Sequence, residues 1–349
     1  MIKKITGNKD FTEYLRGKSA SFVLSITTTK TCNIPNLTQA GIPGLIHLTP
    51  TLDSEFLCSG EVRSLKNIAK TPKGVPTPAL ISRAVQLLKP FRDMEIFDLG
   101  VDTKIKVDYF KVRDFALKPS ESIDKEANIE AKKLYELGKE FARGYNPEGD
   151  YVILAESVPG GTTTALATAL ALEYDCEGKF SSSFKNKPNG IKEEVVKRAL
   201  ENIESDDDIF EKLSKVSDNM LVFNAGFVAG MSKREIPLVL AGGTQMACVL
   251  MIANRIEKGL DGKNLGLFTT KWVAEDKNSD IEALLNMLDF KVNAFYADFD
   301  FSLSSHPALK LYDEGEAKEG VGAGGALIYG LLNGLSKEDI TRKVESFLG

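Results

Sequence analysis

The stretch from Ala155 to Thr164 reads AESVPGGTTT and lies between two apolar segments of different character. The preceding Tyr151–Leu154 is a short apolar run, which predicts a buried strand. The following Ala165–Leu172 is rich in Ala and Leu, which are strong helix formers. A Gly- and Thr-rich turn from strand to helix leaves backbone N–H groups without partners at the positive end of the helix dipole. Such a turn suits a phosphate, and Glu156 adds an acidic side chain to it.

This junction is not specific by itself, because Gly- and Thr-rich turns between strands and helices are common in α/β proteins. It lacks the Gly-Lys-Ser/Thr of a Walker phosphate-binding loop. It also lacks the Gly-x-Gly-x-x-Gly fingerprint of dinucleotide-binding proteins. The interpretation of the junction therefore depends on the rest of the chain.

Short apolar runs alternate with helix-forming stretches along the chain. This alternation predicts an α/β fold with a mostly parallel, doubly wound (Rossmann-like) sheet and helices on both faces. Ligands of such folds bind at the carboxyl ends of the strands. The predicted strands are Phe22–Ile26, Glu95–Gly100, Tyr151–Leu154, Met220–Phe223, Ile236–Leu240, Leu265–Thr269 and Asn293–Tyr296. The predicted helices are Leu80–Leu88, Ile123–Phe141, Thr163–Leu172, Lys192–Ile203, Gln245–Ile256 and Ile281–Leu288.

The chain has 349 residues, enough for one large domain or two. We expect residues 20–305 to form an α/β nucleotide-binding core. Residues 28–74 read as a long insertion in this core, because they show little periodicity and many Pro, Thr and Gly residues. Residues 1–19 and 306–349 are predicted to form a small helical lobe.

The composition is that of an ordinary globular protein, with 43% hydrophobic and 27% charged residues. A net charge of −5 argues against a protein that binds nucleic acid through its phosphates. Only two histidines and four widely separated cysteines occur, so we expect no metal and no cofactor. Neither a signal peptide nor an apolar run of membrane-spanning length is evident, and scattered thiols fit a reducing compartment, so the predicted location is the cytoplasm.

Five further features occur in a fixed order along the chain. They are Gly74–Val85 (GVPTPALISRAV), Asp98–Val101 (DLGV), Glu156–Thr164 (ESVPGGTTT), Lys192 with the following VV and AL pairs, and Glu319–Ala323 (EGVGA). Taken together, they resemble the nicotinate-nucleotide–dimethylbenzimidazole phosphoribosyltransferase family, in the form of its archaeal-type members. The resemblance runs from about Gly74 to Leu335.

The sequence departs from the pattern of this family in several places. The Gly-x-Gly-Thr-Gly loop before the lysine is FSSS here, at Phe180–Ser183. The family's Val-Val-Asp-Gly-Phe is VLAGG, at Val239–Gly243, so that Ala241 replaces an acid. The stretch from Ser304 to Glu319 is shorter than in the family. These departures concern the nucleotide and base pockets, and they bear on the identity of the accepting base more than on the reaction class.

The resemblance implies a reaction between small molecules. The 5-phosphoribosyl group of nicotinate mononucleotide moves to a benzimidazole-type or related aromatic base, giving an alpha-ribazole phosphate-type nucleotide for the lower ligand of a cobamide (cobalamin). The donor pyridinium leaves as a neutral ring, so its departure needs no metal. The resemblance also implies a homodimer, and nothing in it points to a nucleic acid or membrane partner.

The resemblance assigns roles to individual residues. Glu319 becomes the general base that takes a proton from the acceptor ring, whereas without the family pattern it reads as a glutamate at a helix flank. Glu156 either stabilises positive charge on the ribose, positions the acceptor, or only accepts hydrogen bonds from the Thr162–Thr164 turn. Lys192 either pairs with the donor phosphate or is an ordinary surface lysine. The other predicted nucleotide-binding residues are Gly160, Gly161, Thr162, Ser182, Gly242, Gly243 and Ser304, and the predicted base pocket contains Pro76, Thr77 and Ser82.

Two other function classes compete with the transferase. A non-catalytic nucleotide-binding or regulatory protein on the same fold is compatible with the altered Ser181–Ser183 loop and with Ala241. An NAD-dependent oxidoreductase is suggested by the fold alone, and the missing Gly-x-Gly-x-x-Gly weakens it. The presence of both Glu156 and Glu319 favours the enzyme, because a binder of an anionic nucleotide gains nothing from two nearby carboxylates.

Overall fold

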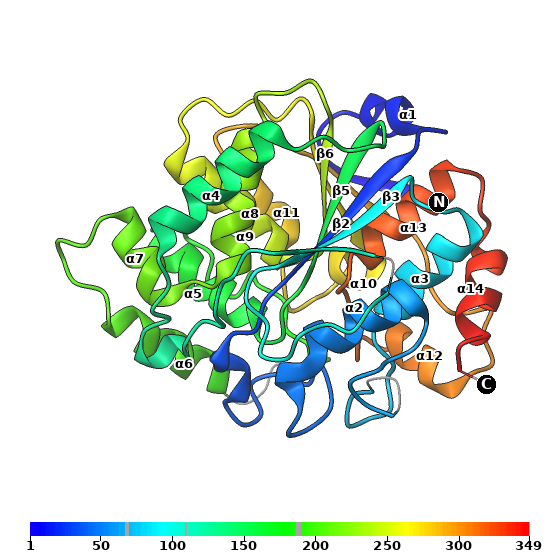
Figure 1. The fold of residues 1–349 in the computed structure, drawn as a ribbon, viewed down its shortest axis with the longest axis horizontal. Helices are drawn as coiled ribbons and strands as arrows, with labels where there is room; N and C mark the ends of the chain where they lie inside the picture. The colour runs from blue at the N-terminus through cyan, green and yellow to red at the C-terminus, as the bar shows by residue number, and fades with distance from the viewer. Residues whose placement is uncertain (67–69, 109, 186–189, 349) are drawn as a thin grey trace.

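The protein is built on one eight-stranded sheet that helices cover on both faces (Figure 1). The computed structural model describes residues 1–66, 70–108, 110–185 and 190–348. The strand order is β1-β8-β7-β6-β5-β2-β3-β4, and only the pairing of β1 with β8 is antiparallel. The strands are β1 (Ile2–Thr6), β2 (Ala20–Ile26), β3 (Asp93–Asp98), β4 (Lys111–Asp114), β5 (Tyr151–Ser157), β6 (Leu238–Ala241), β7 (Leu265–Thr270) and β8 (Asn293–Ala297). The predicted mostly parallel α/β fold is confirmed.

The helices occupy two layers, seen to the left and right of the sheet in Figure 1. One layer contains α4 (Ala131–Gly144), α5 (Gly161–Ala171), α6 (Ile191–Glu201), α7 (Ile209–Val216), α8 (Asn219–Met231), α9 (Thr244–Ile256) and α11 (Ile281–Leu285). The other contains α1 (Asp10–Leu15), α2 (Thr49–Ser59), α3 (Ala79–Leu88), α12 (Pro307–Asp313), α13 (Ala323–Leu332) and α14 (Lys337–Glu345). The short helix α10 (Lys271–Ala274) follows β7, and the 3-10 turns are η1 (Lys30–Asn33), η2 (Ile46–Leu48) and η3 (Ile123–Lys125).

The alternation of side chains along each strand produces two separate cores. In β5, Val152 and Leu154 belong to the core under α4, α5, α8 and α9. Tyr151, Ile153 and Ala155 belong to the core under α2, α3 and α13. Both faces of the strand are therefore buried, which explains why the sequence of β5 is a continuous apolar run rather than an alternating one.

The predicted strand at Met220–Phe223 is wrong, because these residues form the start of α8. All thirteen residues of α8 are buried, so its sequence lacks the polar face that reveals a helix. The backbones of α8 and α4 approach closely: a Cβ atom on Gly226 would lie 2.0 Å from the carbonyl oxygen of Tyr135. The signal in favour of a helix was Asp218, whose side chain caps α8 by accepting from the N–H of Leu221.

Two other expectations need correction. The helix predicted over Ile123–Phe141 is split into η3 and α4, because Glu126 and Asn128 adopt positive φ angles between them. The segment 28–74 was expected to lack periodic structure, but it contains η1, η2 and α2. Ten of the eleven residues of α2 are buried, so this helix also lacks an amphipathic pattern.

Both chain ends lie on the same side of the molecule in Figure 1. Residues 2–6 form a strand of the main sheet, and α13 packs against β7 and α3. The proposed division into a core and a small terminal lobe stays a prediction.

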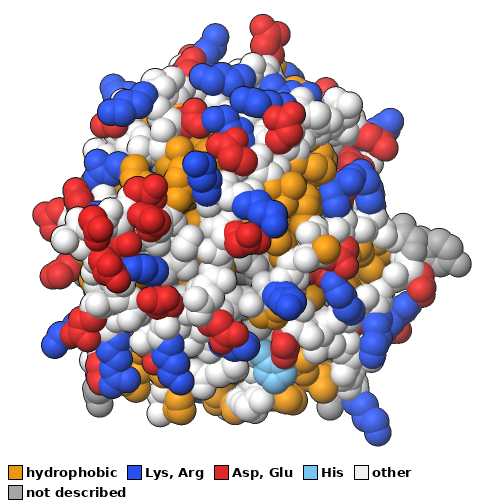
Figure 2. All heavy atoms as spheres, turned by 60° about the vertical axis from the view of Figure 1, so that its left-hand side comes forward, with side chains coloured by type: hydrophobic (Ala, Val, Ile, Leu, Met, Phe, Trp, Pro, Cys, Tyr) orange, Lys and Arg blue, Asp and Glu red, His pale blue; other side chains and the backbone are white. Residues whose placement is uncertain are grey.

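The surface in Figure 2 carries acidic and basic side chains interspersed over most of the face shown. Within the described residues, none of the helices has both the length and the apolar character needed to cross a membrane.

Candidate functional site

The strand ends of β5 and β6 lie side by side, and each is followed by the N-terminus of a helix. Ala155 pairs with Ala241, and α5 and α9 start a few residues later. The two turns therefore lie next to each other at one edge of the sheet. A third segment joins them, because the N–H of Val321 donates to the carbonyl oxygen of Glu156 at 2.8 Å. The turn that starts α13 is therefore fixed to the end of β5.

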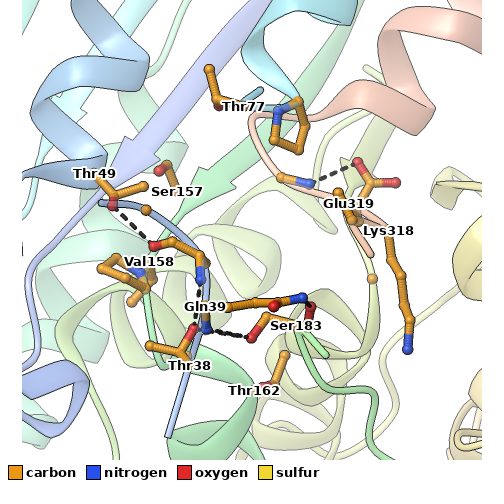
Figure 3. A pocket seen from close by; sticks show the side chains of 18 of the residues that line it. Thr38, Gln39, Thr49, Thr77, Ser157, Val158, Thr162, Ser183, Lys318 and Glu319 are labelled. Atoms are coloured by element: carbon orange, nitrogen blue, oxygen red, sulfur yellow. Dashed lines mark hydrogen bonds between the residues drawn. The ribbon is translucent and has the colours of Figure 1, made fainter. Parts of the chain in front are cut away.

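These segments surround a pocket at the carboxyl edge of the sheet (Figure 3). The inserted segment closes part of it with residues 38–41, Thr49 and Asp53. The turn before α3 and the loop at residues 181–183 supply further walls. The pocket brings together these predicted site residues: Pro76, Thr77, Glu156, Gly160, Gly161, Thr162, Ser182, Gly243 and Glu319.

Glu319 lies at the wall of the pocket, directly before the turn into α13. Its Oε2 accepts from the N–H of Thr270 at 3.0 Å and from the hydroxyl of Thr269 at 3.3 Å. Its Oε1 accepts from the N–H groups of Gly320 at 3.3 Å and Gly324 at 3.1 Å. Desolvation raises the pKa of Glu319 to about 7, and the four hydrogen bonds oppose that rise. The carboxylate is thus held in one orientation and titrates near neutral pH.

Glu156 is 3% exposed and comes from β5, one residue before the end of the strand. Burial raises its pKa to about 8, and the negative charges of Glu319, Asp218 and Asp53 add to the rise. The backbone N–H of Val158 acts in the opposite direction. A Cβ atom on Gly242 would lie 3.6 Å from Glu156 Oε1, so the small residue at this position leaves room beside the carboxyl group. Glu156 and Glu319 therefore share one electrostatic environment.

The turn between β5 and α5 has the form expected of an anion site. Gly160 has φ of 78°, a left-handed conformation that glycine adopts without strain. The N–H of Thr162 lies in the first turn of α5, where an α-helix leaves its N–H groups without helical partners. The side chain of Gln245 packs so close to Gly161 that a Cβ there would lie 1.9 Å from Gln245 Oε1. The turn therefore favours glycine at position 160, and a larger residue at position 161 would have to displace the Gln245 side chain.

Lys192 lies in the first turn of α6 and is 7% exposed. Its Nζ donates to the carbonyl oxygen of Ser181 at 2.8 Å, so it contacts the loop that forms one wall of the pocket. The same loop is tied to α9, since the hydroxyls of Ser181 and Thr244 lie 3.0 Å apart. Lys192 itself lines a second cavity between α5 and α6, which shares Ser182 with the first. The remaining part of the loop, residues 186–189, lies outside the described residues.

Three predicted site residues have other surroundings. The hydroxyl of Ser304 donates to Glu345 of α14 at 2.5 Å. Ser82 is fully buried in α3 and donates to the carbonyl oxygen of Val321 at 2.7 Å. The N–H of Gly242 is used by the carbonyl oxygen of Phe268. Ser82 and Gly242 thus form hydrogen bonds to residues next to the site without lining the pocket. Ser304 instead contacts the C-terminal helix α14.

Asp53 and Gln39 also line the pocket, although neither belongs to a motif in the sequence. Asp53 is 3% exposed, and burial raises its pKa to about 6. Gln39 connects the inserted segment to two other loops. Its Nε2 donates to the carbonyl oxygens of Ser183 at 2.6 Å and Glu316 at 3.1 Å. Both residues come from the inserted segment, where the only signal was the presence of an acid and an amide in a stretch too long for a plain connection.

Comparison with known proteins identifies relatives of the whole chain. Residues 89–263 match the family model described as phosphoribosyltransferase. A UPF0284 protein of Saccharolobus islandicus (strain L.S.2.15 / Lassen #1) is 36% identical over 357 residues, which cover 100% of this chain and 97% of the relative. A UPF0284 protein of Sulfolobus acidocaldarius is 37% identical over 352 residues, covering 96% of this chain and 98% of the relative.

The fold is also that of a solved structure. The nicotinate-nucleotide–dimethylbenzimidazole phosphoribosyltransferase from Thermus thermophilus superposes with a TM-score of 0.61 at 16% identity, covering 95% of this chain and 84% of that one. The chain therefore belongs to the phosphoribosyltransferase family whose model it matches. It is an enzyme that transfers phosphoribosyl groups.

Proposed function

We propose that the enzyme moves the 5-phosphoribosyl group from nicotinate mononucleotide to a benzimidazole-type or related aromatic base. The product is an alpha-ribazole phosphate-type nucleotide that supplies the lower ligand of a cobamide. The observation that carries the proposal is the position of Glu319: a fixed carboxylate in the same pocket as the glycine-rich N-terminus of α5. The carboxylate can take the proton that the aromatic acceptor ring loses, and the N-terminus of α5 can bind the phosphate of the donor.

Glu319 is the general base of the proposed reaction. As the acceptor nitrogen attacks the ribose, the second ring nitrogen becomes acidic and gives its proton to the carboxylate. A base is most effective when its pKa lies near the working pH, and the pKa of Glu319 is raised to about 7. The hydrogen bonds from Thr270 and Gly324 hold the carboxylate in place for this transfer.

The donor is bound by the neighbouring segments. Its phosphate lies against the first turn of α5, with Lys192 close behind the loop 181–183. Glu156 lies beside the ribose, where positive charge develops as the neutral nicotinate leaves. Burial raises the pKa of Glu156. A positive charge on the ribose would lower this pKa again, and the ionised carboxylate would in turn stabilise the positive charge.

Support for the substrates comes from the neighbour of known structure, whose name specifies a nicotinate nucleotide and dimethylbenzimidazole. The proposal also includes the homodimer that the resemblance implies and the cytoplasmic location that the sequence predicts. It treats the altered Ser181–Ser183 loop as a variant of the phosphate site rather than its loss, because Lys192 still contacts it.

The decisive experiment is a transfer assay. The purified protein is incubated with nicotinate mononucleotide and a panel of aromatic bases, and released nicotinate and the new nucleotide are quantified. Release that depends on an added base supports the proposal. Tight binding of nicotinate mononucleotide without release of nicotinate under any condition favours the non-catalytic nucleotide-binding protein instead.

A further inference from the structure

One face of the pocket is organised by a carboxylate from the inserted segment. Asp53 of α2 accepts hydrogen bonds from the hydroxyls of Thr77 at 2.6 Å and Ser157 at 2.7 Å. Thr77 precedes α3, and Ser157 is the last residue of β5, so the three residues join three segments that line the pocket. We call Asp53, Thr77 and Ser157 the Asp53 face. Figure 3 labels Thr77 and Ser157 among the residues that line this pocket.

The Asp53 face offers hydrogen-bond acceptors only. A hydroxyl group has a single proton, and Thr77 and Ser157 both use theirs on Asp53. Thr77 Oγ1 additionally accepts from the N–H of Ala79 at 3.2 Å, which fixes the direction of its proton. An ionised carboxylate has no proton to give and has about four lone-pair sites, of which these hydroxyls occupy two. What remains for a ligand is lone pairs on three adjacent side chains.

This polarity has a strong energetic consequence, because all three side chains are at least nine-tenths buried. An N–H group placed against the Asp53 face forms a charge-assisted hydrogen bond. A carbonyl oxygen in the same position meets lone pairs and loses its hydration without compensation, and an alkyl group leaves the carboxylate desolvated. Val75, Pro76 and Val158 line the same pocket, and their apolar side chains suit the flat faces of an aromatic ring.

The Asp53 face and Glu319 both line the pocket. Tyr312 is fully buried, and its hydroxyl donates to the carbonyl oxygen of Pro76. Burial raises the pKa of Tyr312, and the charges of Asp53 and Glu319 raise it further. A base that delivers its ring proton to Glu319 has other edges, and one of them can meet the Asp53 face in the same pocket.

We propose that the accepted base carries an N–H donor, such as an exocyclic amino group, on the edge that it presents to the Asp53 face. Asp53 is then the residue that selects for amino-bearing bases over equally large bases with an alkyl or carbonyl group at that position. The inference rests on the proposed function, because it takes this pocket to be the acceptor site.

The test compares bases of the same shape. Adenine is paired with 6-methylpurine, and 5-aminobenzimidazole with 5-methylbenzimidazole, because an amino and a methyl group are nearly equal in size. Binding to the full-length protein is measured by calorimetry, with and without ribose 5-phosphate and always without the donor. We expect the amino member of at least one pair to bind about tenfold or more tightly, as loss of a hydrogen bond to a charged group predicts. Asp53→Asn should reduce that preference at least fivefold.

Two further variants keep the test interpretable. Ser157→Ala removes one acceptor and should also lower the preference, by a smaller factor, in a protein that retains Asp53. Glu55→Gln is the matched control: Glu55 lies on the same helix and is fully buried, but it accepts from the backbone of Arg63, Ser64 and Lys106 instead of facing the pocket. This variant should leave the preference unchanged.

The outcomes separate this inference from the proposed function. A preference in neither pair, a preference that Asp53→Asn leaves intact, or failure of every base to bind overturns the inference. A protein that shows the preference but never releases nicotinate from the donor refutes the proposed function alone. A protein that transfers to amino and methyl bases equally well refutes the inference alone.

Discussion

Glu95 and Glu156 are buried carboxylates on β3 and β5, the two strands that flank β2, but their surroundings are opposite. Glu95 is 1% exposed and faces two cations of β4, Lys111 at 3.1 Å and Arg113 at 2.9 Å. Glu156 is 3% exposed and lies among other acids, namely Glu319, Asp218 and Asp53. Within the described residues, neither Glu156 nor Glu319 forms a salt bridge.

The difference distinguishes a structural carboxylate from a functional one. The charge of Glu95 is neutralised inside the fold, so its role is to join the edge strand β4 to the sheet. Glu156 has no ion-pair partner among the described residues, and burial together with the neighbouring acids raises its pKa to about 8. Such an arrangement costs folding free energy and is typical of sites where a ligand supplies the missing charge.

The largest expected effect follows from Glu319→Gln. If Glu319 is the base, turnover should fall by about 10²–10⁴-fold, the usual contribution of a positioned proton acceptor. The wild-type rate should fall as the pH drops below about 7, because protonation removes the base, and the variant should lack this dependence. Steady-state rates of nicotinate release between pH 5 and 9 provide the measurement.

The alternative for Glu319 is a purely structural role at the start of α13, where it accepts from the N–H of Gly324. In that case the variant loses up to about 1 kcal/mol of stability and keeps its turnover. Melting temperature and turnover measured on one preparation decide between the two roles. A fully active but less stable variant contradicts the assignment of Glu319 as the base.

Glu156→Gln should stabilise the protein at high pH. The pKa of Glu156 is raised from 4.5 to about 8 on folding, so between these values the folded state keeps a proton that the unfolded state has released. Its contribution to stability therefore falls as the pH rises through this window. A neutral Gln avoids the loss, and we expect a gain of about 2–4 kcal/mol at pH 8.5 and little change near pH 4.5. Urea denaturation at both pH values tests this, and equal gains at both contradict it.

Lys192→Ala tests the cation that is proposed to pair with the donor phosphate. Loss of a charge-assisted phosphate contact should weaken donor binding by about 1.5–3 kcal/mol, raising KM for the donor about 10–100-fold with a smaller change in kcat. Lys197→Ala is the control, because Lys197 is on the same helix and its exposed side chain pairs with Glu201 at 3.9 Å. An unchanged donor KM in Lys192→Ala, or the same increase in Lys197→Ala, argues against the phosphate role.

The smallest effect is expected from substitution of Glu95, the carboxylate with two cations beside it. Glu95→Gln keeps the shape of the side chain but leaves Lys111 and Arg113 without their counter-charge. Both cations are partly exposed, so we expect a loss of about 1–2 kcal/mol in stability and unchanged kcat and KM. A large fall in activity at full stability would remove the distinction drawn between the two carboxylates.

Most of the sheet was predictable because its strands are short apolar runs bounded by turns. The edge strands β1 and β4 were not predicted, since IKKIT and KVRD carry too many polar side chains to read as buried strands. The helices α2 and α8 were missed for the opposite reason, because they are buried all around and lack a polar stripe. Hydrophobic periodicity reveals a helix or strand only when one of its faces is buried and the other faces solvent.

The candidate site was predicted in part. Glu156, Gly160, Gly161 and Glu319 were found because each lies in a local motif, and the structure brings them to one pocket. Asp53 has no local motif. Its importance depends on hydroxyl groups 24 and 104 residues away in the sequence, which only the folded chain brings to it.

The place of β1 at the edge of the sheet has a consequence for synthesis on the ribosome. Its partner β8 starts at Asn293, so the first strand of the chain has no neighbour until nearly all residues have been added. At about 5–20 residues per second, this wait is roughly 15–60 s. β2, in contrast, meets β3 after fewer than a hundred residues. The strands β2 and β3 are therefore available to pair early in synthesis, and the pairing of β1 with β8 can complete the sheet only shortly before α12, α13 and α14 are added.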